Sequence, residues 1–114
     1  MINNLYNYKA TVVRVVDGDT VELMIHLGFT IVWRSTCRLY GINTPELTSK
    51  DPLVRAKALE AKQYLIDKLP AGTLTYISSK ELDKYGRPLA ELYYSAEMKH
   101  LNQELLDAGL AVKM

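Results

Sequence analysis

Three segments in the first part of the chain are rich in β-branched and aromatic residues, a pattern that indicates strands. We predict strands over Tyr6–Val16, Thr20–Leu27 and Phe29–Tyr40. Asp17-Gly18 interrupts the first two, and Gly28 marks the bend before the third. Because Asp-Gly tolerates the positive φ angles of tight turns, the first two strands are expected to form a hairpin.

The pattern changes after the third strand. Residues Ile42–Lys50, with Pro45 among them, predict a loop, and Asp51-Pro52 predicts the start of a helix, with a capping carboxylate followed by proline. One apolar stripe then recurs at helical spacing, and Pro70 and Gly72 end the predicted helix. The residues of the stripe are Val54, Ala58, Ala61 and Leu65.

The rest of the chain predicts two further strands, Thr73–Ser79 and Leu89–Tyr94, and a helix near Lys99–Ala108 that ends at Gly109. The expected class is therefore α+β, mainly β with helices. Five strands with a helix after the third and another at the C-terminus match the OB-fold, a partly open Greek-key barrel. The length of 114 residues fits one domain spanning residues 1–114.

Net charge and cysteine content exclude few functions. The chain carries 14 basic and 13 acidic residues, a formal charge of +1, so polyanions would need a local cluster of charge to bind. The single cysteine, Cys37, excludes an internal disulfide and is expected to be a buried, inert thiol.

Targeting signals are absent from the pattern. No segment approaches the roughly 18 apolar residues that cross a bilayer. Met1–Lys9 lacks the apolar centre of a signal peptide. The sequence as given favours a soluble, cytoplasmic protein without membrane or obligate protein partners, or a secreted one if a leader was removed.

Polar residues gather in three patches, Asp17–Thr20, Arg38–Glu46 and Asp83–Ala90. Each patch alone is compatible with an ordinary turn or solvated loop. Arg38 is harder to explain, because it lies in an apolar strand and burial of a lone arginine is costly. We expect an anionic partner for it, which is Asp19, Glu46 or a bound phosphate.

Together the patches contain the chemistry of phosphodiester hydrolysis. Asp19, Asn43 and Glu46 offer hard oxygen donors that suit Ca²⁺ or Mg²⁺. Arg38 and Arg87 carry planar guanidinium groups that match phosphate oxygens. Such fixed cations stabilise the charge that grows on a phosphoryl group in the transition state, and a carboxylate can position or deprotonate the attacking water.

In this order, the three patches resemble those of the staphylococcal nuclease family, and the resemblance extends from about Lys9 to Val112. It implies a calcium-dependent nuclease, a phosphodiester endonuclease acting on DNA and RNA, with one Ca²⁺ ion and with Mg²⁺ or Mn²⁺ as alternatives. It also implies that Asp19 is the carboxylate ligand of calcium and that Thr44 is a ligand through its backbone carbonyl. Asp17 is expected to support the turn.

The resemblance also implies roles at the phosphate. Arg38 and Arg87 match the arginines that hold the scissile phosphate, and Glu46 matches the glutamate that acts as general base or orients water. Lys84 and Tyr85 match residues that contact the neighbouring phosphate of a bound nucleotide.

Two departures from the family pattern stand out. Asn43 replaces the second calcium carboxylate; its amide oxygen can still be a ligand, but the lost charge predicts weaker calcium binding.

The family's C-terminal segment carries tyrosines that stack on the base, and this sequence shows none after Gly109. Tyr40, Tyr93 and Tyr94 are candidate substitutes, although each is expected to pack on the barrel. Both departures leave open a second hypothesis, a nucleic-acid-binding OB-fold module with weak or no catalysis, and a third is an OB-fold that binds protein.

Overall fold

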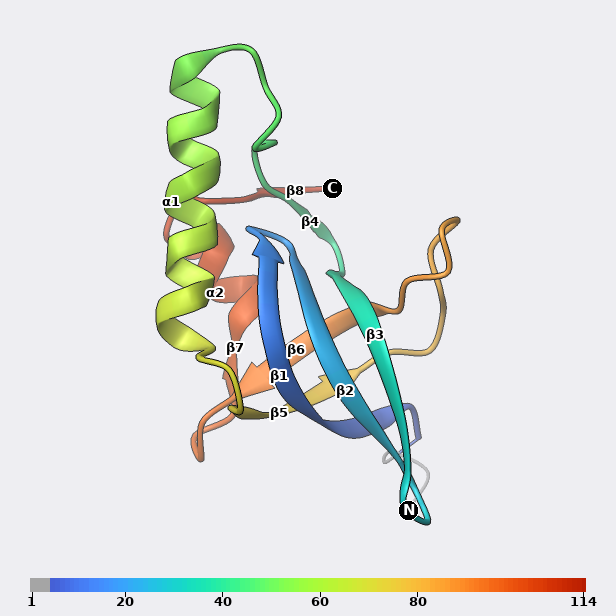
Figure 1. Cartoon of the computed structure of the whole chain (residues 1–114). Coiled ribbons are helices and arrows are strands. Elements are labelled where there is room, and N and C mark those ends of the chain that lie inside the picture. The colour runs from blue at the N-terminus through green and yellow to red at the C-terminus, as the bar shows by residue number, and fades with distance from the viewer. Residues whose placement is uncertain (1–4) are drawn as a thin grey trace.

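The computed structural model describes residues 5–114, and within them five long strands form a closed barrel flanked by two helices (Figure 1). The long strands are β1 (Asn7–Asp17), β2 (Thr20–Gly28), β3 (Ile31–Leu39), β5 (Leu74–Ser78) and β6 (Leu89–Tyr94). The helices are α1 (Pro52–Lys68) and α2 (Leu101–Asp107). Two-residue strands are β4 (Ile42–Asn43), β7 (Lys99–His100) and β8 (Val112–Lys113). This architecture confirms the predicted α+β OB-fold.

Strand order explains how the barrel closes. The sheet runs β3-β2-β1-β5-β6-β7, and its neighbours in this order pair antiparallel. Closure comes from a short parallel contact between β3 and β6, with Arg38 opposite Leu89 and Leu39 opposite Ala90. Register shifts in β1 lie between Val12 and Arg14 and between Val15 and Asp17, and such irregularities let the long strand bend and pair with both β2 and β5. Closure therefore brings the end of β3 beside the loop that precedes β6.

The core fills the barrel and extends under both helices. Every second strand residue points inward, as Leu23, Cys37 and Leu92 do, with at most 1% of each exposed. Helix α1 buries Ala58, Ala61 and Leu65, three residues of the predicted stripe, and α2 buries Leu101 and Leu105. Burial also raises the pKa of the Cys37 thiol to about 12, which keeps it protonated, as expected for an inert thiol.

The helix signals were accurate at α1. Asp51 caps the helix, its Oδ1 accepting a hydrogen bond from the Leu53 N–H at 2.9 Å, and Pro52 follows it in the first turn. The second helix begins two residues later than predicted, at Leu101. Lys99 and His100 instead form β7, which pairs with β6. His100 is the N-cap residue of the helix, and its side chain forms no capping hydrogen bond.

Two other segments differ from the prediction. The predicted loop Ile42–Lys50 begins with β4, which pairs with β8 from the far end of the chain. The third strand begins at Ile31, because Phe29 and Thr30 form the turn with φ angles of 53° and 72°. Neither feature has a local sequence signal, since one depends on a distant partner and the other places non-glycine residues in a left-handed conformation.

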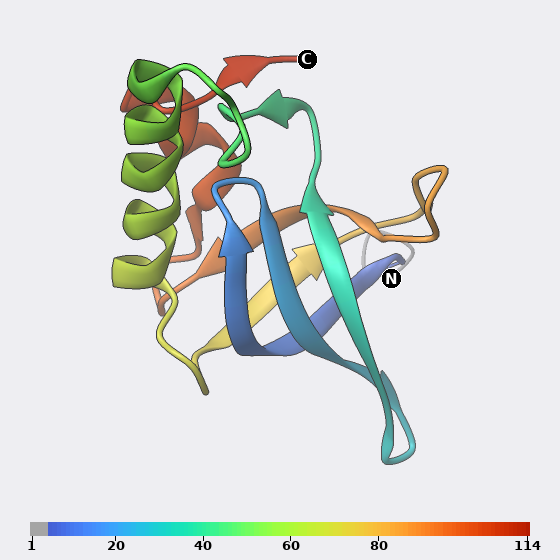
Figure 2. The ribbon, with the colours of Figure 1, turned by 45° about the horizontal axis from the view of Figure 1, so that its top comes forward.

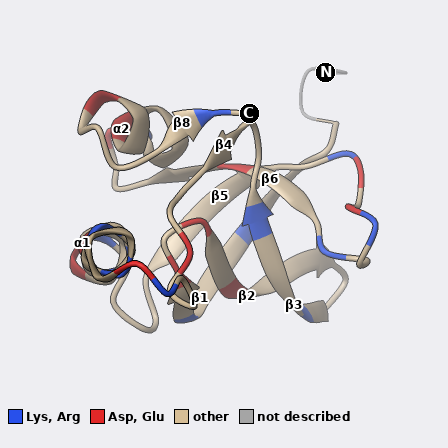
Figure 3. Cartoon of the chain, turned by 90° about the horizontal axis from the view of Figure 1, so that it is seen from above, with Lys and Arg blue, Asp and Glu red and all other residues tan. Residues whose placement is uncertain are grey.

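The polar patches meet at one end of the barrel. The β1–β2 turn, the end of β3, β4 and the start of α1 all lie at this end (Figures 1 and 2). Seen from above, acidic and basic residues both occur on its loops and strand ends (Figure 3). Among the helices within residues 5–114, none is long and apolar enough to cross a membrane.

Candidate active site

A cavity of about 480 Å³ opens where the three polar patches converge. Six of the residues singled out in the sequence line it: Asp19, Arg38, Asn43, Thr44, Glu46 and Arg87. They come from the β1–β2 turn, from β3, from β4 and the segment after it, and from the loop before β6. The fold thus gathers residues that are up to several dozen positions apart around one space.

The β1–β2 turn sets the position of Asp19. Gly18 sits so close to α1 that an added Cβ would lie 2.7 Å from the Ala61 Cβ and 2.9 Å from the Thr44 Oγ1. The Asp19 N–H donates to Asp17 Oδ1 at 3.2 Å, so Asp17 supports the turn, as expected. Tight packing at Gly18 therefore holds the turn, α1 and Thr44 in one arrangement.

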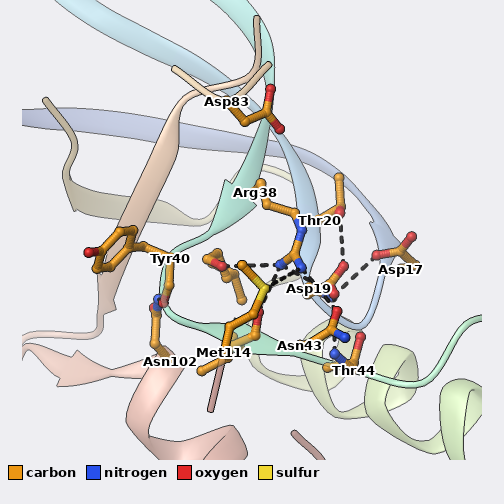
Figure 4. A network of polar contacts seen from close by, with 12 residues as sticks. Asp17, Asp19, Thr20, Arg38, Tyr40, Asn43, Thr44, Asp83, Asn102 and Met114 are labelled. Carbon is orange, nitrogen blue, oxygen red and sulfur yellow. Dashed lines mark hydrogen bonds and ion pairs between the residues drawn. The ribbon is translucent and has the colours of Figure 1, made fainter. Parts of the chain in front are cut away.

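Arg38 is held by five acceptor atoms of the protein (Figure 4). Its Nη1 lies 3.3 Å from Asp19 Oδ2 and donates to the carbonyl oxygens of Leu39 and Ile42 at 3.2 and 3.1 Å. Its Nη2 donates to Asn43 Oδ1 at 3.1 Å and contacts Met114 Sδ at 3.6 Å. The anionic partner expected for Arg38 is therefore Asp19, and the arginine also ties the end of β3 to β4.

Asp19 is buried and surrounded by donors. Its Oδ1 accepts from the Thr20 hydroxyl at 3.0 Å, and its Oδ2 accepts from the Thr44 N–H at 3.3 Å. Burial raises the pKa of this carboxyl, but the side chain of Asp17, the charge of Arg38 and the Thr44 N–H together outweigh it and lower the pKa below its ordinary value. Asp19 is thus ionised at neutral pH.

A second carboxylate adds negative charge to the same cavity. Asp17 lines it beside Asp19. Burial and the neighbouring Asp19 raise the pKa of Asp17, because two carboxylates held together resist full ionisation. A cation in this cavity would relieve that repulsion.

Arg87 has more freedom than Arg38. Its Nε donates to Asp83 Oδ2 at 2.7 Å, while Asp83 Oδ1 accepts from the backbone N–H groups of Tyr85 and Arg87 at 2.8 and 2.9 Å. Its guanidinium carbon lies 5.4 Å from the centre of the Tyr85 ring. Within residues 5–114 no acceptor binds the terminal N–H groups of Arg87, so this fork is available to a ligand.

Glu46 is exposed at the edge of the cavity. None of the described side chains forms a hydrogen bond or ion pair with its carboxylate; its backbone carbonyl accepts from the Ser49 N–H at 3.2 Å. Both oxygens are therefore accessible to a water molecule or ligand.

Lys84 and Tyr85 lie outside the cavity lining, on the same loop as Arg87. Tyr85 is 72% exposed, and the Lys84 Nζ lies 5.2 Å from the centre of its ring. The structure thus does not bring these two residues into the cavity itself, although they border it through Arg87.

The oxygen atoms near Asp19 are of the type that binds a hard cation such as Ca²⁺, but together they carry little negative charge. In the described part of the chain, no three His, Cys, Asp or Glu side chains converge as a metal site. A cation beside Asp19 would therefore rely on the Asn43 amide, the Thr44 carbonyl and water for its other ligands. Asp19 already accepts three polar contacts, which leaves it roughly one of its four lone-pair sites.

The three tyrosines proposed as base-stacking substitutes lie in different environments. Tyr94 is 7% exposed and its hydroxyl donates to Glu104, so it belongs to the core. Tyr40 is 51% exposed, but its ring turns away from Asp19 in Figure 4. Tyr93 lies outside this cavity, on the outer face of β6, where its ring stacks on His100.

Sequence reasoning missed two residues that contact the predicted arginines. Asp83 holds Arg87, and opposite charges spaced i, i+4 were the available signal. Met114 contacts Arg38, and it is carried there by β8, whose pairing with β4 has no local signal.

Fold and site together define a small OB-fold barrel with an arginine-rich, oxygen-lined cavity at one end. The chain belongs to the staphylococcal nuclease homologue family, whose model matches residues 36–114. Membership makes it a relative of nucleases, and a nucleic acid is the substrate class that this family suggests.

Two relatives cover nearly the whole chain. An uncharacterized protein of Methanocaldococcus jannaschii is 31% identical over 126 residues, covering 92% of this chain and 58% of its own length. An uncharacterized protein of Bacillus anthracis is 27% identical over 113 residues, covering 97% of this chain and 50% of its own length. The chain thus spans between 50% and 58% of the length of these relatives.

Proposed function

We propose that residues 1–114 form one domain that is a calcium-dependent nuclease hydrolysing phosphodiester bonds of DNA and RNA. The observation that carries the proposal is the convergence of Arg38, Arg87, Glu46 and Asp19 on one cavity. This set combines fixed cations for a phosphoryl group, an accessible carboxylate for water and a buried anion for a metal ion.

Arg87 is the primary phosphate ligand in this proposal. Asp83 holds its Nε at 2.7 Å, and its terminal N–H groups have no acceptor among residues 5–114, so they can bind a phosphate. Arg38 acts with it after exchanging its contacts with Asn43 and Met114 for phosphate oxygens. Because Asp83 holds Arg87 before the substrate arrives, Arg87 stabilises the developing charge with little reorganisation.

Glu46 acts on the attacking water. Its carboxylate has no protein partner in residues 5–114 and lines the same cavity as both arginines. It either accepts a proton from the water or orients it in line with the leaving oxygen. Lys84 and Tyr85, next to Arg87, contact the neighbouring phosphate.

Asp19, the Asn43 amide and the Thr44 carbonyl would hold the calcium ion. When bound, such an ion polarises a phosphoryl oxygen and lowers the pKa of a bound water. Asn43 contributes no charge and its Oδ1 accepts from Arg38 in this structure, which supports weak calcium binding. The same donors accept Mg²⁺ or Mn²⁺.

A second candidate function is nucleic-acid binding without catalysis. It is favoured by the contacts that both terminal nitrogens of Arg38 already make with the protein, and by the missing charge at Asn43. Against it stands Glu46, because an exposed carboxylate beside a phosphate site weakens binding unless it serves a reaction.

Single-residue variants separate these functions. Hydrolysis of single-stranded DNA is measured with Ca²⁺ for wild type, Arg38→Ala, Arg87→Ala and Glu46→Gln. We expect each variant to lose at least about a hundredfold in rate, as when a transition-state donor is removed. Arg34→Ala is the matched control, since Arg34 lies on the same strand as Arg38 but pairs with Glu22 away from the cavity.

Because Arg38 also joins β3 to β4, the melting temperature of the Arg38→Ala variant is measured in parallel. Arg38→Lys is a further control that retains the positive charge. Unchanged hydrolysis in Arg87→Ala and Glu46→Gln would refute the assignment. DNA binding without hydrolysis under every divalent cation would favour the second function.

A further inference from the structure

A second groove lies on the outer face of the barrel, away from the candidate active site. It measures about 760 Å³ and no residue that lines it also lines the cavity at Asp19. Its side chains include Leu5, Lys9, Tyr76, Tyr93 and Met98, and we refer to it as the tyrosine groove.

Strand register builds the groove. Lys9 on β1 is opposite Tyr76 on β5, Tyr76 is opposite Tyr93 on β6, and Tyr93 is opposite His100 on β7. Their neighbours along each strand, such as Ala10, Thr75 and Leu92, point into the core, so this row points outward. The row therefore places one lysine and three rings side by side across four strands, which are drawn in Figure 1.

The rings are arranged for stacking. Tyr93 and His100 are stacked with centroids 4.7 Å apart and planes 15° apart, and this contact restricts the Tyr93 ring. Tyr76 and Tyr93 are both half-buried, so part of each ring remains open to the groove. Exposed Leu5 and Met98 add apolar surface.

Charge in the groove favours an anionic partner. Lys9 is exposed and forms no ion pair with any of the residues that the structure describes. The carboxylate of Glu91 lies 3.6 Å from His100 Nε2, and Glu91 is not among the residues that line the groove. The combination of aromatic faces with an uncommitted cation is the chemistry that binds single-stranded nucleic acid, with bases on the rings and phosphate at the cation.

We propose that the tyrosine groove is a second binding site for single-stranded nucleic acid, with Tyr76 and Tyr93 stacking on bases and Lys9 contacting the backbone. The inference rests on the proposed function, because it takes nucleic acid as the polymer that the domain binds. The groove would hold part of the strand while another part occupies the cavity at Arg87.

Binding and hydrolysis are measured separately. Anisotropy of a labelled thymidine oligomer of about 15 nucleotides, near the upper site size of one OB-fold, is recorded in chelator so that no cleavage occurs. Tyr93→Ala and Tyr76→Ala are expected to weaken binding about tenfold each, and Tyr93→Phe and Tyr76→Phe to retain it. Lys9→Gln should weaken binding and reduce its salt dependence, whereas Lys68→Gln, on α1 over Tyr64, should not.

NMR chemical-shift changes of the wild-type backbone amides are also recorded on addition of the oligomer. This measurement uses no variant, so misfolding of a variant cannot affect it. Shifts at Lys9, Tyr76 and Tyr93 support the proposal. Equal affinity of wild type and both alanine variants, or shifts confined to the cavity, would overturn it. A partner that binds the groove as a peptide and displaces no nucleic acid would also overturn it.

Hydrolysis of a dinucleotide distinguishes this proposal from the proposed function. A dinucleotide spans only the cavity, so the tyrosine variants should cleave it at the wild-type rate. If the protein hydrolyses the dinucleotide but the tyrosine variants bind the oligomer as wild type does, only the groove proposal is refuted. If oligomer binding depends on the tyrosines but no hydrolysis occurs, only the nuclease function is refuted.

Discussion

Asp83 controls where the Arg87 guanidinium lies. One of its oxygens accepts two backbone N–H groups of its own loop, and the other accepts Arg87 Nε. Asp83→Asn keeps an oxygen for the loop and removes the negative charge that pairs with Arg87. We expect hydrolysis to slow by up to about a hundredfold, because the phosphate ligand is no longer fixed. Steady-state kinetics with a melting curve check this, and an unchanged rate would contradict the positioning role.

The same pair gives a pH dependence. Burial raises the pKa of Asp83, but hydrogen bonds from the Arg87 N–H and side chain, with that of the Tyr85 N–H, lower it below its ordinary value. The stability that Asp83 contributes is therefore present above an unfolded-state pKa of about 3.9 and is lost as pH falls through the folded-state value. Urea unfolding should show wild type and Asp83→Asn converging below roughly pH 4. A difference that stays constant into acid would exclude the ion pair as its source.

In the proposed metal site, we expect Asn43 to limit the calcium affinity. Its substitution by aspartate adds a charge beside Asp19, although Arg38 shares that charge. We expect Asn43→Asp to bind calcium roughly tenfold more tightly or better, since ligand charge tunes calcium sites over such ranges. Calorimetric titration of calcium without substrate measures this directly. Equal affinity in the two proteins would remove Asn43 from the metal site.

At the scale of elements, the β1–β2 turn depends on its contact with α1. Gly18→Ala would place a Cβ 2.7 Å from the Ala61 Cβ, and overpacking of this kind costs about 1–3 kcal/mol. Urea unfolding is expected to show that loss. Ala61→Gly removes the closest contact, although the Thr44 Oγ1 contact at 2.9 Å remains. Because glycine inside a helix costs about 1 kcal/mol by itself, Ala61→Gly is measured with and without Gly18→Ala, and it should cost less in the presence of Gly18→Ala. Additive losses would mean that the two elements are not coupled here.

Local signals sufficed for elements that stabilise themselves. Asp17 and Asp51 accept hydrogen bonds from their own local backbone, so the hairpin and the start of α1 were predictable. Gly18 does not adopt the positive φ expected of it; its small size is needed because an added Cβ would lie 2.7 Å from the Ala61 Cβ. Pairing of β4 with β8 joins residues near position 42 to residues near position 113, and no local pattern contains that information. The same holds for the Met114 contact with Arg38.

At the scale of the whole molecule, the candidate site depends on barrel closure. The parallel pairing of Arg38 with Leu89 joins β3 to the strand that follows the Arg87 loop. The cavity residues could be named from the sequence because the three patches resemble a family pattern. Their hydrogen-bond partners could not, because these depend on the closed barrel: both terminal nitrogens of Arg38 contact the protein, whereas Arg87 is held through its Nε.

The most direct measurement is hydrolysis of single-stranded DNA by the wild-type chain with Ca²⁺, Mg²⁺, Mn²⁺ or a chelator. The proposed function predicts fragments with Ca²⁺ and intact DNA with the chelator. Intact DNA with every cation, or equal hydrolysis with the chelator, would contradict it.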